Sequence, residues 1–207
     1  MLEIFFSSFI SFFVIVDPLG TAAVFSAMTT RMTSRARRKI ALKAVIIAVI
    51  LLVFFGFAGE FLLVNMGISL DAFRIAGGLL LFITAFQMIM GHHDSDTISA
   101  DESIIKDTSN IAVYPLAIPL LAGPGGITAM ILNMNSANAI EHKSIVIGCV
   151  ILVHIIALVC MLGAAKLTKM LGNTGATLVS RLMGILLAAL AVQFIADGIM
   201  NLARQIT

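Results

Sequence analysis

The stretch Ile118-Pro119-Leu120-Leu121-Ala122-Gly123-Pro124-Gly125-Gly126-Ile127 places two prolines and three glycines in the middle of an apolar segment long enough to cross a bilayer. A proline inside a helix removes a backbone donor and clashes with the preceding turn, at a cost of about 3 kcal/mol. In lipid, non-helical backbone is tolerated only where it faces protein or a water-filled cavity. The stretch therefore predicts a helix that is broken in mid-membrane and faces the inside of the protein.

A second break lies near the N-terminus, where Val16-Asp17-Pro18-Leu19-Gly20 interrupts the apolar run of residues 4–28. All four prolines of the chain fall in or near these two breaks. Interrupted apolar segments at corresponding positions in the two halves of a chain indicate the binding site of a transporter.

The composition excludes an ordinary soluble domain, because 60% of the residues are hydrophobic and only 12% are charged. A spanning helix needs about 20 apolar residues. Six segments meet this length, at about 4–28, 40–64, 70–90, 112–135, 144–168 and 178–202. We therefore expect an all-α membrane protein of six transmembrane helices, with the first and fourth helices broken at mid-membrane.

Basic residues are concentrated between the first two segments, where residues 31–43 hold six of them: Arg31, Arg35, Arg37, Arg38, Lys39 and Lys43. The positive-inside rule assigns this connection to the cytoplasm, so both termini are expected outside. The net charge is only +2. A topology signal that also contacts anionic lipid head groups accounts for the basic residues, and no nucleic-acid partner is expected.

The two halves of the chain repeat each other. Superposing the two breaks aligns three residue pairs, Pro18 with Pro124, Gly20 with Gly126 and Ala23 with Ala129. The third helix of each half opens with the same frame, Arg74, Gly77 and Gly91 in one and Arg181, Gly184 and Gly198 in the other. Three helices per half is an odd number, so the second copy is expected to be inverted. The predicted organisation is a first repeat at 1–90, a cytoplasmic linker at 91–111 and a second repeat at 112–207.

Each break has the signature of a half-helix that begins in mid-membrane. Asp17 is a favoured N-cap and Pro18 a favoured first residue, and Gly123-Pro124 has the same character. A helix N-terminus offers unpaired N–H groups and about half a positive charge, which suits a carboxylate. The candidate amides are those of Gly20, Thr21, Gly125, Gly126 and Ile127. Carbonyls around Val16 and Ala122 would receive an ammonium group, so the two breaks together predict a site for a zwitterion.

Four stretches of the chain resemble the MarC family: Asp17-Pro18-Leu19-Gly20, Phe73-Arg74-Ile75-Ala76-Gly77-Gly78, Pro115-Leu116-Ala117-Ile118-Pro119 running into Ala122-Gly123-Pro124-Gly125, and Ser180-Arg181-Leu182-Met183-Gly184. This is a bacterial and archaeal group of six-helix inner-membrane proteins that includes neutral amino acid transporters. The resemblance covers essentially the whole chain. It implies a multi-pass protein of the bacterial or archaeal cytoplasmic membrane.

Each candidate residue also has a purely structural reading. An ionisable residue inside the membrane is functional by default, which favours Asp17 as a coupling group, but Asp17 as a cap can also serve structure alone. His154, the second coupling candidate, is either a proton relay or a hydrogen-bonded packing residue. Small residues at the breaks either line the site or only permit close helix packing. The cluster His92, His93, Asp94 and Asp96 has metal-ligand residue types, but no second cluster accompanies it and we expect no metal.

No HExxH, GxSxG or nucleotide-binding loop occurs in the chain, so neither an enzyme nor a cofactor is expected. We expect a secondary transporter of small neutral amino acids, acting as an exporter or exchanger by alternating access between the repeats. Its expected partners are the amino acid, protons or another coupling ion, and membrane lipid, and a homo-oligomer is left open. The alternatives are a non-transporting membrane assembly or lipid-interacting protein, and a drug efflux protein.

Overall fold

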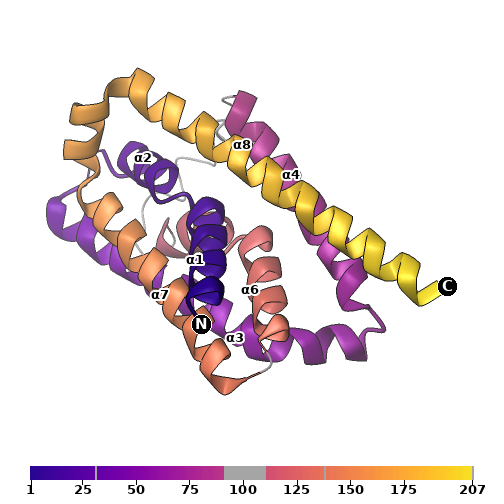
Figure 1. The fold of residues 1–207 in the computed structure, drawn as a ribbon. Coiled ribbons are helices and arrows are strands. Elements are labelled where there is room, and N and C mark those ends of the chain that lie inside the picture. Colours follow the sequence, from indigo (N-terminus) through magenta and orange to yellow (C-terminus); the bar gives the residue numbers. More distant parts are fainter. Residues whose placement is uncertain (31, 91–110, 138, 207) are drawn as a thin grey trace.

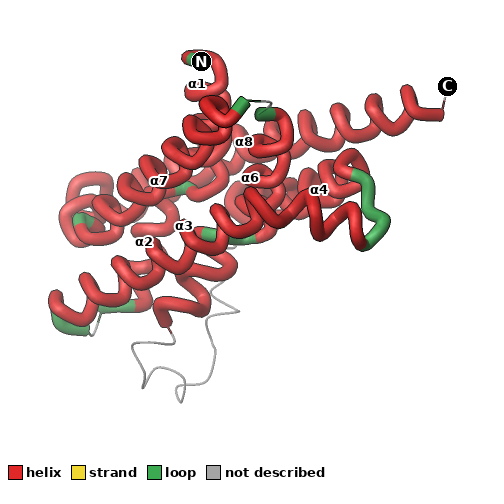
Figure 2. Tube along the Cα trace, turned by 90° about the horizontal axis from the view of Figure 1, so that it is seen from below, coloured by secondary structure: helices red, strands yellow, loops and turns green. Residues whose placement is uncertain are grey.

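The computed structural model describes residues 1–30, 32–90, 111–137 and 139–206, apart from the side chains of 115, 165–174, 176 and 206. The described residues form helices with no strand among them (Figure 1, Figure 2). In chain order these are α1 (Leu2–Val16), α2 (Pro18–Met28), α3 (Ser34–Asn65), α4 (Leu70–Met90), η2 (Ala112–Leu121), α6 (Pro124–Ser136), α7 (Ile140–Leu162) and α8 (Ala164–Ile206). The predicted linker, which contains His92, His93, Asp94 and Asp96, lies outside the described residues except for its last residue, Ile111.

Five stretches are long and apolar enough to cross a membrane, namely Leu2–Met28, Ser34–Asn65, Leu70–Met90, Ile140–Leu162 and Thr177–Gln205. The pair η2 and α6, bent by 54°, makes a sixth when it is counted as one span. Large apolar side chains point outward, among them Ile50 at 63% and Phe61 at 69% exposed. A surface of this kind belongs in lipid, so the predicted class, an all-α protein with up to six spans, is confirmed.

The fourth span is more irregular than the sequence prediction, because η2 itself contains two extended residues. Tyr114 has φ −128° and ψ 128°, and Ile118 has φ −129° and ψ 123°. Each directly precedes a proline, and the proline ring pushes the preceding residue out of the helical region. The break is therefore spread over most of η2 and ends at Gly123-Pro124.

The second predicted span, helix α3, begins earlier than predicted, at Ser34 and not near residue 40. The Thr33 hydroxyl caps it by accepting from the Ala36 N–H at 3.3 Å. Most of the basic residues predicted in a connection therefore lie on the first turns of α3. The stretch between the fifth and sixth predicted segments, residues 169–177, is likewise helical, because α8 runs from Ala164 to Ile206. That the basic side faces the cytoplasm stays a prediction.

Helix α4 lies along the C-terminal part of the longer helix α8 (Figure 1). A Cβ built on Gly78 would lie 2.8 Å from the Ala191 carbonyl oxygen, and a Cβ on Gly198 would lie 2.8 Å from the Asp71 carbonyl oxygen. A higher residue number on one helix thus faces a lower number on the other, so the two helices run antiparallel. Glycines at these positions let the two backbones approach closely.

The packing of the two halves is reciprocal. Helices α1 and α2 pack on α7, and η2 and α6 pack on α3. In the same way α2 contacts α8, while α6 contacts α4. If α1 and α2 correspond to η2 and α6, α3 to α7, and α4 to α8, each contact in one half has a counterpart in the other. The antiparallel helices α4 and α8 would then be equivalent. An inverted duplication requires this pattern, although the duplication itself stays a prediction.

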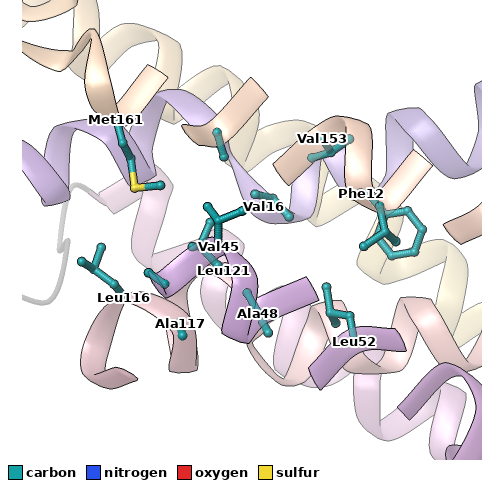
Figure 3. Close-up of a cluster of buried hydrophobic side chains, with 14 of the residues drawn as sticks. Phe12, Val16, Val45, Ala48, Leu52, Leu116, Ala117, Leu121, Val153 and Met161 are labelled. Carbon is teal, nitrogen blue, oxygen red and sulfur yellow. The ribbon is translucent and has the colours of Figure 1, made fainter. Parts of the chain in front are cut away.

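The two breaks lie in the main hydrophobic cluster of the protein. Val16 precedes the first break and Leu121 the second, and they are 2% and 1% exposed. Figure 3 shows both side chains in one cluster, together with Val45 of α3 and Val153 of α7. The fold thus brings to its centre the two stretches that interrupt its helices.

Candidate functional site

The first break is built around Asp17, which ends α1 and caps α2. Its backbone has φ 41° and ψ 74°, the left-handed conformation that aspartate tolerates better than most residues. The carboxylate oxygen Oδ1 accepts from the Gly20 N–H at 3.1 Å. A Cβ on Gly20 would collide with the Asp17 carboxylate, so the cap requires glycine there. Pro18 is the first residue of α2, as predicted.

The polar groups around Asp17 are already paired in this conformation. The Gly20 N–H donates to the Asp17 side chain, and the Thr21 N–H donates to the Asp17 carbonyl at 2.9 Å. The Thr21 hydroxyl donates to the Val16 carbonyl at 2.8 Å. Of the groups predicted to receive a zwitterion, those of the first break are therefore engaged within the protein.

The second break differs, because no side chain caps α6. Gly123 is the N-cap residue and Pro124 the first helical residue. The Ile127 N–H donates to the Gly123 carbonyl at 3.0 Å, so the amide of Ile127 is taken. The amides of Gly125 and Gly126 have no hydrogen-bond acceptor within the part of the chain that the structure describes. Both residues are buried, so the N-terminus of α6 keeps two unpaired donors inside the protein.

The two breaks touch at this N-terminus. Ile15, two residues before Asp17, has its Cγ2 atom 3.9 Å from the Cβ positions of both Gly125 and Gly126. A Cβ on Gly126 would also lie 3.6 Å from Leu52 Cδ2 and 3.9 Å from the Leu121 carbonyl oxygen. The first broken span thus reaches the N-terminus of α6 through Ile15, and the unpaired donors lie on the side of the second break. That the N-termini of α2 and α6 together form one site stays a prediction.

Helix α7 passes both breaks. His154 is fully buried, and its imidazole lies beside the carbonyl of Leu121 at the second break. Cys160, farther along α7, lies within electrostatic reach of the Asp17 carboxylate. The two coupling candidates, Asp17 and His154, are therefore associated with different breaks.

Two polar contacts near α6 were not predicted as part of the site. The Ser8 hydroxyl of α1 donates to Asn133 Oδ1 at 3.1 Å, which joins the first and fourth spans. The Thr128 hydroxyl donates to the Pro124 carbonyl at 2.9 Å, and its side chain packs against Gly77 of α4. A polar residue in an apolar segment is the only sequence signal for these contacts, and it does not identify the partner.

The groups at the N-terminus of α6 are suited to binding an anion. Two buried N–H groups at the positive end of a helix attract an anionic group such as a carboxylate. No cluster of three or more His, Cys, Asp or Glu side chains suited to a metal ion occurs in the described portion.

Fold and site together define a polytopic α-helical membrane protein with two interrupted helices that meet at its centre. The chain belongs to the MarC family: the family described as "MarC family integral membrane protein" matches residues 2–203. It is 38% identical to a UPF0056 membrane protein of Archaeoglobus fulgidus, over 96% of this chain and 93% of the relative. It is 37% identical to the UPF0056 membrane protein YhcE of Escherichia coli, over 95% of this chain and 92% of the relative. No solved structure matches the chain.

Proposed function

We propose that this protein is a secondary transporter of small neutral amino acids, working as an exporter or exchanger and not as an enzyme. Its substrate carboxylate would bind the amides of Gly125 and Gly126. The observation that carries the proposal is this pair of buried donors, unpaired within the described chain, at the N-terminus of a half-helix. A lipid-interacting or assembly protein has no need of unpaired donors at its centre, because a buried N–H without a partner is costly.

The backbone of Asp17 supports a functional centre. A non-glycine residue in the left-handed region costs of the order of 1 to 3 kcal/mol and persists where the surrounding structure enforces it. Such residues cluster at active and binding sites. The strain lies near the proposed binding amides, because the Cγ2 atom of Ile15, two residues before Asp17, lies 3.9 Å from the Cβ positions of Gly125 and Gly126.

The reciprocal packing of the halves supports alternating access. Two inverted repeats provide two equivalent half-molecules that rock against each other around a central site. Broken helices with their breaks in contact give such a motion a pivot. Protons are the proposed coupling ion, with Asp17 as the first candidate group and His154 as the second.

Space at the site favours a small substrate. A Cβ on Gly126 would already be in van der Waals contact with Leu52 Cδ2 at 3.6 Å and with Ile15 Cγ2 at 3.9 Å, so apolar side chains closely bound the proposed site. Glycine, alanine, serine and threonine are the proposed substrates on this ground.

Both termini are proposed to lie outside the cytoplasm, and lipid surrounds the outward apolar faces.

Uptake and counterflow in proteoliposomes test the proposal. A panel of labelled amino acids should show saturable exchange of glycine, alanine, serine or threonine, with leucine and lysine excluded. Empty liposomes provide the baseline. Absence of exchange for every small neutral amino acid would refute the proposal, and export of apolar drugs in its place would support the efflux alternative.

A further inference from the structure

The hydrogen bond of His154 determines which of its two ring nitrogens carries the proton. Nδ1 lies 2.8 Å from the carbonyl oxygen of Val150, one turn earlier in α7. A backbone carbonyl only accepts, so Nδ1 carries the proton and donates it. In the neutral imidazole, Nε2 is therefore left with a lone pair and acts as an acceptor.

Nε2 is buried and has no hydrogen-bond partner among the described residues. The His154 side chain is 0% exposed, so bulk water does not solvate this atom. A buried polar atom without a partner is rare in native proteins and calls for an explanation. Here the explanation has to be found at the second break, where the ring lies.

The group beside the ring is also an acceptor. The Leu121 carbonyl ends η2 and lies within hydrogen-bonding reach of the His154 ring, and no backbone N–H of the described residues donates to it. Its oxygen lies 3.9 Å from the Cβ position of Gly126, next to the unpaired amides of α6. With the proton on Nδ1, the neutral ring has no Nε2–H to donate to this carbonyl, so two acceptors lie side by side. A group with several N–H donors would satisfy both.

We propose that His154 Nε2 and the Leu121 carbonyl oxygen form the subsite for the α-ammonium group of the transported amino acid. This inference rests on the proposed function and assigns the orientation of the bound substrate within the site. The carboxylate lies on the amides of Gly125 and Gly126, and the ammonium lies on the acceptors beside them. An α-amino acid requires such neighbouring subsites, because one carbon atom carries both of its charged groups.

The test compares alanine with lactate, which has the same carbon skeleton and carboxylate but a hydroxyl in place of the ammonium group. Binding is measured on the full-length protein in lipid nanodiscs, and exchange is measured in proteoliposomes. The parent should prefer alanine. A hydrogen bond to a charged group corresponds to about a 10- to 100-fold effect, so His154→Phe should weaken alanine binding by that factor and leave lactate binding unchanged.

His142→Phe is the matched control, because it makes the same substitution on the same helix outside the site. This variant should keep the parent preference for alanine. His154→Gln retains an acceptor oxygen and should recover part of the preference. A His154→Phe variant that discriminates alanine from lactate as the parent does would overturn the subsite, while a parent that exchanges no small neutral amino acid would refute the proposed function itself.

A second measurement does not depend on the folding of these variants. In a protein whose only remaining histidine is ¹⁵N-labelled His154, alanine should shift the Nε2 resonance and lactate should not. An Nε2 resonance that is insensitive to alanine under conditions where alanine is exchanged would show that the ammonium binds elsewhere.

Discussion

Replacing Gly126 by alanine separates a binding role from a packing role. The nearest atoms to the new methyl group would lie at 3.6 to 3.9 Å, which is ordinary van der Waals contact. Gly126 lies in a regular helix, so alanine adopts its backbone conformation and should stabilise the fold by about 0.4 to 1 kcal/mol. We therefore expect normal expression and a melting temperature equal to or above that of the parent.

Transport should nevertheless fall. Helical Cα–Cβ bonds tilt toward the N-terminus, so the methyl group at position 126 would lie toward the unpaired amides. Losing one hydrogen bond between an amide and a carboxylate corresponds to about 1.5 to 3 kcal/mol, or roughly a 10- to 100-fold loss in kcat/KM for alanine. Gly126→Leu should abolish transport, because its side chain extends into the space bounded by Leu52 and Ile15.

Gly125→Ala is the matched control for stability. Its Cβ would collide with Leu81, whose Cγ atom would lie 2.9 Å away and whose side chain is 2% exposed. We expect a destabilisation of about 1 to 3 kcal/mol from overpacking. Initial rates of labelled alanine counterflow, normalised to reconstituted protein, give the comparison. A stable Gly126→Ala variant that transports alanine at the parent rate would refute the placement of the carboxylate.

Three further predictions concern coupling, topology and packing. Asp17→Asn retains the cap and removes the charge, so we expect exchange to persist and pH-driven accumulation to disappear; accumulation equal to the parent's would make Asp17 a cap alone. Cysteines placed at Ser34 and Ser99 in a cysteine-free background should resist an impermeant reagent in intact cells, and labelling of both would reverse the orientation. Gly78→Ala should lower stability by about 1 to 3 kcal/mol, because its methyl group would lie 2.8 Å from the α8 backbone. Gly148→Ala is the control and should be neutral or stabilising, because nothing lies within 4 Å of its Cβ position. Equal melting temperatures for the two variants would contradict this packing.

The sequence predicted the elements of the fold because their causes are local. Apolar length defines a membrane span, and the pair Asp17-Pro18 defines a helix start wherever it lies. The class, the spans and both breaks were therefore readable from residue order. The ends of the helices were harder to predict. Helix α3 begins at Ser34 because its charged first turns are also helical, and a criterion based on apolar length leaves charged turns out.

The sequence by itself determined that this is a helical membrane protein of the MarC family with one break in each half. Only the tertiary structure decided which break keeps free donors. Asp17 fills the first N-terminus with its own carboxylate, while no side chain caps Gly123-Pro124, and a pattern of prolines and glycines does not distinguish these outcomes. The position of His154 beside Leu121 was equally hidden, because a contact between helices depends on how they pack, and the order of residues along either helix does not record it.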